Sequence, residues 1–342
     1  MKIKKLDKAA FDKWVNSCIE NQRVYGVQAK EDRFVFGPLA SAKDLRLDYD
    51  VTILPPKKYF LPPRDTLLKF DRKEGFESVF DNQPFVLFGV HPYDMVAISQ
   101  TDKLFARDQY DTHYFNRRQK ATIVACDVQN ASKEVFAGCM GTATVDDGFD
   151  ILITKVESYY LVDIHTEKGQ ALARTIMDAE DADEMSLKLR KLVWADNTKL
   201  LQKHKLHVQP DVLPRLLDRS YEHPIWEEKA QRCYSCGSCN LVCPTCYCFD
   251  VRDDVEWNLQ KGQRYRVWDG CLLSEFATVA GGHNFRRNRA DRYRHRYYRK
   301  GKYVPEMIGE VACVGCGRCI TACTAKIANP VEVYNKLVDE GK

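Results

Sequence analysis

The chain has 342 residues, of which 44% are hydrophobic and 29% charged, and its formal net charge is +4. It is long enough for two domains with sizeable cores, and its nearly balanced charge identifies no class of partner. No apolar stretch approaches the length of a membrane span, and the basic stretch MKIKKLDKAAFDKW lacks the apolar run of a secretory signal. With 14 cysteines and no such signal, we expect a reducing, cytoplasmic location, which disfavours a disulfide framework.

The first predicted element is an amphipathic helix over residues 6–20, whose apolar positions recur at helical spacing. Cys18 lies on its apolar side, so we expect a packed core thiol rather than a metal ligand. Residues 50–70 contain two Pro-Pro pairs, which favour an extended segment along a surface or under a partner.

A βαβ unit follows, with its two strands and crossover helix at residues 85–90, 122–126 and 94–105. Asp94 is the predicted N-cap of this helix. If the strands are parallel, residues 91–93 and Cys126 emerge at the same carboxyl edge, where open α/β sheets keep their sites.

Further along the chain we predict a hairpin over residues 150–163 and a polar helix over residues 180–195. The inner side of that helix is expected to carry Met185, Leu187, Leu192 and Val193. The charged, proline-containing stretch 196–230 is predicted to link to a second domain.

Two cysteine runs carry the strongest signal in the chain. The spacing C-x2-C-x2-C-x3-C occurs at Cys233, Cys236, Cys239 and Cys243, and again at Cys313, Cys316, Cys319 and Cys323. This is the bacterial ferredoxin run, in which three cysteines bind one [4Fe–4S] cluster and the fourth crosses to the neighbouring cluster. We therefore predict one cluster held by Cys233, Cys236, Cys239 and Cys323, and another held by Cys313, Cys316, Cys319 and Cys243.

Two four-thiolate zinc sites are the alternative use of these eight cysteines. Structural zinc usually takes two C-x2-C pairs rather than four cysteines within eleven residues, so clusters are favoured. The predicted architecture is an α/β domain at residues 1–220, with a short mixed or parallel sheet and helices, followed by an α-helical ferredoxin-like dicluster domain at residues 221–342.

Three more cysteines, Cys246, Cys248 and Cys271, remain after the eight are assigned. A third cluster would explain them, with Cys126 as its fourth ligand or Cys139 as the alternative. Otherwise the three are buried thiols or hold a structural metal.

Residues 286–302 are rich in arginine and tyrosine, a composition that can bind nucleic acid. Because cysteine runs flank this segment, we favour two other roles: offsetting the negative charge of thiolate-bound clusters, or docking an acidic partner subunit. We expect no nucleic-acid partner.

The sequence has no dinucleotide fingerprint, no P-loop and no haem attachment motif. We therefore expect a chain that carries electrons rather than hydride or substrate. The rival interpretation, a reductase that acts alone on a small substrate, would need a flavin or an open cluster iron, and no motif indicates either.

The chain resembles the beta subunit of cytoplasmic sulfhydrogenases, the NAD(P)-linked nickel–iron hydrogenases of anaerobes. It is also similar to the A subunit of anaerobic sulfite reductase. The resemblance covers nearly the whole chain and includes the motifs TILPPKKYFLPPRDTLLKFD, FGVHPYD, EHPIWEEKA, CPTCYC, RVWDGC and AGGHNFR.

This resemblance implies a non-catalytic iron–sulfur subunit that passes electrons between a catalytic module and a flavoprotein NAD(P)H-oxidoreductase subunit. The motifs are closer to the hydrogenase branch. The alternatives are the role of the anaerobic sulfite reductase relative and that of an electron-input subunit in a complex similar to heterodisulfide reductase.

The chain departs from the resemblance at three positions. Relatives commonly have cysteine where this sequence has Tyr93, Val135 and Ala137. The resemblance therefore implies no fourth cluster here.

Overall fold

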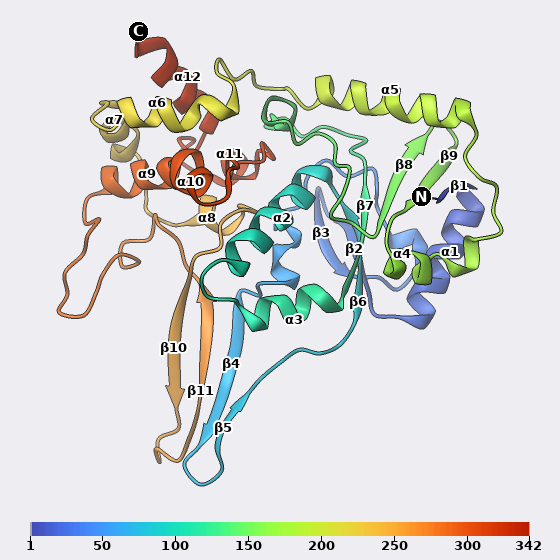
Figure 1. The fold of residues 1–342 in the computed structure, drawn as a ribbon. Coiled ribbons are helices and arrows are strands. Elements are labelled where there is room, and N and C mark those ends of the chain that lie inside the picture. Colours follow the sequence, from blue (N-terminus) through green and yellow to red (C-terminus); the bar gives the residue numbers. More distant parts are fainter. Residues whose placement is uncertain (1, 342) are drawn as a thin grey trace.

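The computed structural model describes residues 2–341, which form a mixed sheet, a helical half and a projecting antiparallel arm (Figure 1). In spatial order the strands of the seven-stranded sheet are β1 (Lys2–Asp7), β9 (Tyr159–Ile164), β8 (Ile151–Val156), β7 (Ala121–Cys126), β6 (Phe85–Val90), β2 (Val24–Lys30) and β3 (Arg33–Pro38). The pairs β2–β6, β6–β7 and β7–β8 are parallel and the others antiparallel. The predicted mixed α/β half is thus confirmed.

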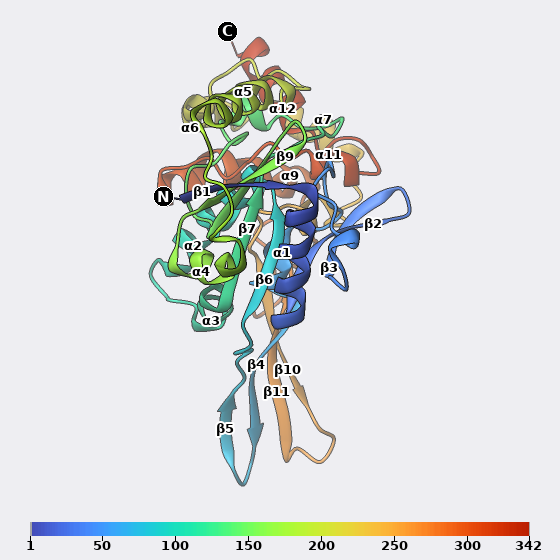
Figure 2. The ribbon, with the colours of Figure 1, turned by 90° about the vertical axis from the view of Figure 1, so that its right-hand side faces the viewer.

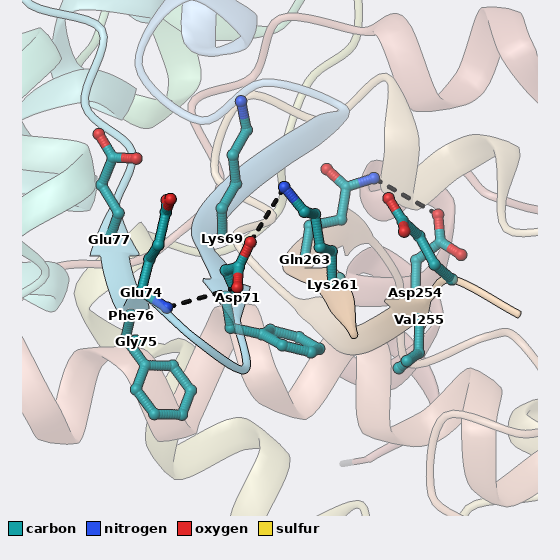
Figure 3. A pocket seen from close by; sticks show the side chains of 13 residues that line it. Lys69, Asp71, Glu74, Gly75, Phe76, Glu77, Asp254, Val255, Lys261 and Gln263 are labelled. Atoms are coloured by element: carbon teal, nitrogen blue, oxygen red, sulfur yellow. Dashed lines mark hydrogen bonds and ion pairs between the residues drawn. The ribbon is translucent and has the colours of Figure 1, made fainter. Parts of the chain in front are cut away.

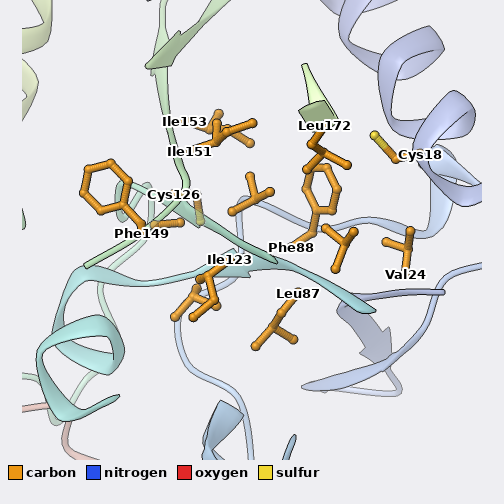
Figure 4. Close-up of a cluster of buried hydrophobic side chains, with 14 of the residues drawn as sticks. Cys18, Val24, Leu87, Phe88, Ile123, Cys126, Phe149, Ile151, Ile153 and Leu172 are labelled. Carbon is orange, nitrogen blue, oxygen red and sulfur yellow. The ribbon is translucent and has the colours of Figure 1, made fainter. Parts of the chain in front are cut away.

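Helices of the first half pack on this sheet: α1 (Lys8–Asn21), α2 (Pro92–Ala106), α3 (Thr112–Lys120), α4 (Glu167–Leu172) and α5 (Glu184–Leu200). Strand β6 is buried along its whole length because each residue of FVLFGV is apolar. The ring of Trp14 on α1 meets that of Phe88 edge to face at 5.5 Å. Figure 4 shows Phe88, Ile123 and Ile151 in this core, with Cys18 of α1 nearby.

Several sequence predictions for this half are confirmed. Helix α1 buries Cys18, and burial raises the pKa of that thiol to about 12, as expected for a core cysteine. Strands β6 and β7 are parallel and joined through α2 and α3, and β8 and β9 form the predicted hairpin. No helix of residues 2–341 combines the length and the apolar character that crossing a bilayer requires.

Other predictions for this half are wrong. Helix α2 begins at Pro92 with His91 as its N-cap, because proline suits the first helical turn, and Asp94 is buried within that first turn. On α5, Met185 and Leu192 are 65% and 60% exposed. The buried residues of α5 are polar instead, and the Ser186 hydroxyl shares a hydrogen bond with the Tyr159 hydroxyl.

The proline-rich stretch 50–70 is extended only in part. Residues Pro56–Tyr59 form a short 3-10 turn, and β4 follows. Rather than lying on a surface, Phe60 and Leu61 are buried in the core of the first half, and the Lys57 ammonium donates to the Cys246 carbonyl in the second half at 2.7 Å.

The second half is α-helical, as predicted. Its helices are α6 (Leu213–Arg219), α7 (Ile225–Gln231), α8 (Ser238–Leu241), α9 (Arg289–Tyr298), α10 (Val304–Ile308), α11 (Arg318–Ala322) and α12 (Pro330–Glu340), with a π-helical turn at Arg299–Tyr303. Helices α6 and α7 lie within the stretch that the sequence marks as a link, and Leu217 and Trp226 are buried in the core of this half.

The arm is a four-stranded antiparallel sheet that takes two strands from each part of the chain. Its order is β10 (Phe249–Val255), β11 (Lys261–Trp268), β4 (Arg64–Asp71) and β5 (Gly75–Ser78). Figures 1 and 2 show it projecting away from the rest of the molecule. The domain boundary at 220/221 stays a prediction, and this sheet joins the chain on both sides of it.

A buried ion pair also joins the two halves. The Arg318 guanidinium on α11 donates to both carboxylate oxygens of Asp94 on α2 at 2.6 Å, and its Nε donates to the Thr52 carbonyl at 2.9 Å. All three residues are buried. Such a pair favours one fixed relation of the halves, because a shift of one half against the other would leave a buried charge without its partner.

We expect Asp94→Asn to lower the free energy of unfolding by about 3–5 kcal/mol, because it leaves the buried Arg318 charge uncompensated. The control is Asp253→Asn, which breaks the exposed Asp253–Arg264 pair on the arm and should cost no more than about 1 kcal/mol. Anaerobic urea denaturation measures both. Equal losses would show that the Arg318–Asp94 pair does not join the halves.

Candidate metal centre

The four cysteines predicted for the first cluster line one cavity. Cys233, Cys236, Cys239 and Cys323 line it together with apolar side chains that include Leu272 and Ile327. Three of them come from the loop before α8 and from α8 itself, and Cys323 follows α11. The backbone N–H groups of Ser235 and Ile327 donate to the sulfurs of Cys233 and Cys323, each at 3.4 Å.

The four cysteines predicted for the second cluster line another cavity. Cys243, Cys313, Cys316 and Cys319 line it, together with Arg296 and Lys300 among others. Cys243 follows α8 and the others lie before and on α11, so each cavity receives its fourth cysteine from the other run. The two runs are thereby interlocked, as the crossed ferredoxin ligand pattern requires.

Glycines make the two turns possible. Gly237 and Gly317 have φ of 72° and 77° and immediately precede α8 and α11. A Cβ on Gly315 would lie 2.6 Å from the Ala137 backbone nitrogen, and one on Gly317 would lie 2.4 Å from the Glu134 carbonyl oxygen. Only glycine combines these left-handed angles with such close backbone approach.

The arrangement fits clusters better than single ions. A zinc ion needs four sulfurs about 2.3 Å from one point. Among residues 2–341, no three or more His, Cys, Asp or Glu side chains come close enough to hold one ion. The cysteines instead line two separate pockets, and backbone amides donate to two of the sulfurs, as they do around cubane clusters.

The surroundings of the thiols are largely buried. Burial raises the pKa of Cys239, Cys313 and Cys316 to about 12 in each case. Cys236 is the exposed member, and the Ser238 hydroxyl lowers its pKa. Thiolates in so dry a site need metal or cationic side chains beside them.

The cationic side chains come from the arginine-rich segment. Arg292, Arg296 and Lys300 recur every fourth residue on α9 and the turn after it, and all three are buried. Arg292 donates to the Ser235 hydroxyl at 3.0 Å, Arg296 to the Cys239 carbonyl at 3.2 Å, and Lys300 to the Thr245 hydroxyl at 2.7 Å. We call these three residues the cationic stripe.

Arg296 holds a special position in the cationic stripe. It lines the second cavity and bonds the carbonyl of Cys239, which lines the first. Its Nε and Nη1 atoms are buried without a hydrogen-bond partner within the described chain. Buried guanidinium N–H groups rarely stay unpaired, so sulfur atoms of a bound group between these cysteines would complete their bonding.

The three remaining cysteines lie near one another. The buried Asn240 amide donates to the sulfurs of Cys271 at 3.3 Å and Cys246 at 3.6 Å. The Cys271 thiol contributes to raising the pKa of Cys248 to about 12, after burial, which is the larger cause. The structure therefore groups Cys246, Cys248 and Cys271, which we call the cysteine trio.

Neither candidate for a fourth ligand contacts the cysteine trio. Cys126 ends β7 inside the hydrophobic core, where Figure 4 shows it between Phe149 and Ile123. Cys139 donates its thiol to the His204 carbonyl at 3.3 Å. A third cluster with either ligand stays a prediction.

The positions at which the resemblance implies lost cysteines form an apolar cluster. Tyr93, Val135 and Ala137 are buried together with Cys316 of the second cavity. The Tyr93 hydroxyl donates to the Asp50 carbonyl at 3.1 Å and contacts His91 Nδ1 at 2.7 Å. Side chains thus fill this region.

Sequence reasoning missed Lys57 and Asn240, which both approach the cysteine trio. Lys57 lies in the proline-rich segment, almost 190 residues from Cys246, and its ammonium also sits over the Trp268 ring at 4.3 Å. No spacing pattern in the sequence links residues so far apart.

These cavities define an iron–sulfur protein of the dicluster class, and comparison with known proteins agrees. A family model described as a 4Fe-4S dicluster domain matches residues 232–327. The chain is 36% identical over 342 residues to the sulfhydrogenase 2 subunit beta of Pyrococcus furiosus, an alignment that covers 99% of this chain and 98% of the relative. The chain belongs to the sulfhydrogenase beta subunit family. No solved structure matches it.

We expect Gly315→Ala to destabilise the protein by about 2 kcal/mol more than Gly281→Ala. Both glycines have positive φ, but a Cβ on Gly281 meets nothing within 4 Å, whereas one on Gly315 meets the Ala137 backbone. Urea denaturation gives the free energies of unfolding, and visible absorption reports cluster retention. Equal free energies of unfolding for the two variants would show that the close approach of Gly315 to the Ala137 backbone is unimportant.

Proposed function

We propose that this chain relays single electrons within a multisubunit complex, a nickel–iron sulfhydrogenase, between the catalytic module and a flavoprotein NAD(P)H-oxidoreductase subunit. The observation that carries the proposal is the pair of crossed, cysteine-lined cavities with Arg296 reaching both. The Pyrococcus furiosus relative is named as a beta subunit, which supports a place in such a complex.

Two [4Fe–4S] clusters would supply one-electron redox chemistry in these cavities. The chain would hold one with Cys233, Cys236, Cys239 and Cys323, and the other with Cys313, Cys316, Cys319 and Cys243. Exposed Cys236 brings the first cavity to the surface, where a partner can approach it, while the cysteines of the second are buried or half-buried. The residues around both keep water out and hold fixed positive charge.

The cysteine trio is proposed to hold a third cluster, with Cys126 or Cys139 as fourth ligand. Its support is that the Asn240 amide contacts both Cys246 and Cys271, that Cys271 lies close enough to Cys248 to raise its pKa, and that the Lys57 ammonium is close by. Anaerobically prepared protein would then contain about twelve irons per chain, and Cys271→Ser about eight. About eight irons in both the wild type and Cys271→Ser would show that the chain holds only two clusters.

The relay is tested in the complex with Cys316→Ser, which removes a thiol from the second cavity. We expect NAD(P)H-linked hydrogen turnover to fall at least about tenfold, because a break in a relay stops transfer between the end sites. Dye-linked hydrogen turnover and dye-linked NAD(P)H oxidation should persist, because each uses one end only.

The control is Cys18→Ser, which alters a core thiol on α1 outside both cavities and should leave NAD(P)H-linked turnover close to wild type. The relay role would be refuted if Cys316→Ser kept NAD(P)H-linked turnover, or if the isolated chain alone reduced NAD, protons or sulfite with dithionite.

Arg296→Gln should lower the midpoint potential of the clusters. Removing a buried positive charge disfavours the reduced, more negative state, and a tenfold fall in the ratio of reduced to oxidised protein corresponds to about 59 mV for one electron. Redox titration followed by electron paramagnetic resonance measures it. Arg294→Gln is the matched control, because Arg294 faces outward on the same helix and pairs with Asp291 and Tyr221. An unchanged midpoint potential in Arg296→Gln would show that the Arg296 charge does not influence the clusters.

A further inference from the structure

The tip of the arm exposes large apolar side chains. Trp257, in the turn between β10 and β11, is 100% exposed, and Phe76 on β5 is 83% exposed. Figures 1 and 2 show this end of the arm far from the sheet and from the helical half. Aromatic side chains concentrated at the end of a projecting sheet are typical of a surface that another macromolecule covers.

An acidic groove accompanies these aromatic side chains. It has a volume of about 550 Å³, and five carboxylates and two lysines line it. Figure 3 shows Phe76 beside Glu74 and Glu77, with Asp254 across the groove. Lys261 is already paired with Asp71 at 3.0 Å, so the charge left for a partner is negative.

The arm is held rigidly enough to present this surface. At its base, buried Asp65 of β4 accepts hydrogen bonds from Arg266 of β11 and Arg117 of α3, each at 3.0 Å. Strand β11 pairs along its length with β10 on one side and β4 on the other. A surface ordered before binding loses little conformational freedom when a partner docks.

We propose that the arm is a docking surface for another protein subunit, which places a basic segment in the groove and receives Trp257 and Phe76 in an apolar recess. This inference rests on the proposed role as one subunit of a redox complex. The residues that line the groove include no cysteine, so the arm would attach the partner rather than conduct electrons to it.

The charge of the groove decides against other occupants. Anionic lipid would be repelled by Glu74, Glu77 and Asp254. A second copy of this chain could not place its own acidic groove against this one, so it would have to dock through a different, basic surface. Such a head-to-tail contact forms open chains or rings rather than a closed pair.

The test uses the complex, purified from cells that express its gene cluster with a tagged copy of this chain. One variant, Phe76→Ser with Trp257→Ser, removes the apolar anchors, and another, Glu74→Gln with Glu77→Gln, removes charge. Val251→Ser is the control, because Val251 is exposed on β10 of the same arm and outside the groove. Mass photometry over a dilution series gives the apparent dissociation constant of the complex, and mass spectrometry identifies the subunits.

We expect the aromatic variant to raise that constant at least about tenfold, because buried aromatic anchors dominate interfaces. The charge variant should weaken binding at low salt and reduce its salt dependence, and Val251→Ser should match wild type. The proposal is overturned if both variants dissociate like wild type. It is also overturned if chemical cross-linking at the tip joins this chain only to a second copy of itself, or if the tip binds anionic lipid vesicles instead of a subunit. A wild-type chain that carries its clusters but retains no other subunit would refute the relay role as well.

Discussion

Burial of concentrated negative charge is the constraint on which the helical half depends. Eight cysteines face two cavities, and a low-dielectric interior tolerates thiolates only beside metal or cations. The cationic stripe of Arg292, Arg296 and Lys300 answers this constraint by turning the charged side of a helix inward. An arginine-rich segment that could be read as a nucleic-acid patch is thus, on one face, part of the core.

The two halves are built to be inseparable. The arm needs β4 from the first half and β11 from the second, and the Arg318–Asp94 pair fixes α11 against α2. Arg318 lies between Cys316 and Cys319, so the short helix α11 and the turn before it carry both cysteines of the second cavity and the contact to α2. A shift of α2 against α11 would therefore move the cysteines of the second cavity directly, because Arg318 and Cys319 lie on the same helix turn.

The sequence predicts local features of this protein well, and long-range ones poorly. Cysteine spacing predicts which cysteines gather around each cavity, because a C-x2-C-x2-C turn determines its own geometry, and their role as ligands stays a prediction. Apolar runs identify β6 and β7. The arm was missed, because β4 and β11 pair across about two hundred residues and their exposed faces carry no alternation of apolar residues. Asp94 was misassigned because an acidic residue near a helix start resembles a cap, and only the fold reveals Arg318 opposite it. The inner side of α5 differs from the prediction because Ser186 and Trp194 make hydrogen bonds there, and Trp194, rather than Met185 or Leu192, packs against the core.

The β10–β11 hairpin both extends to the tip of the arm and positions two cysteines at its base. Strand β10 begins directly after Cys248, and β11 ends at Trp268, three residues before Cys271. Phe249 pairs with Trp268, and the Asp269 N–H donates to the Cys248 carbonyl at 3.1 Å, so the base of the hairpin fixes the two cysteines relative to each other. Antiparallel strands leave and return at the same place. Lengthening both by two residues would move the tip by about 7 Å and leave the cysteine trio where it is. The position of the tip and the geometry of the thiols are therefore separable in this fold, and each can change without the other.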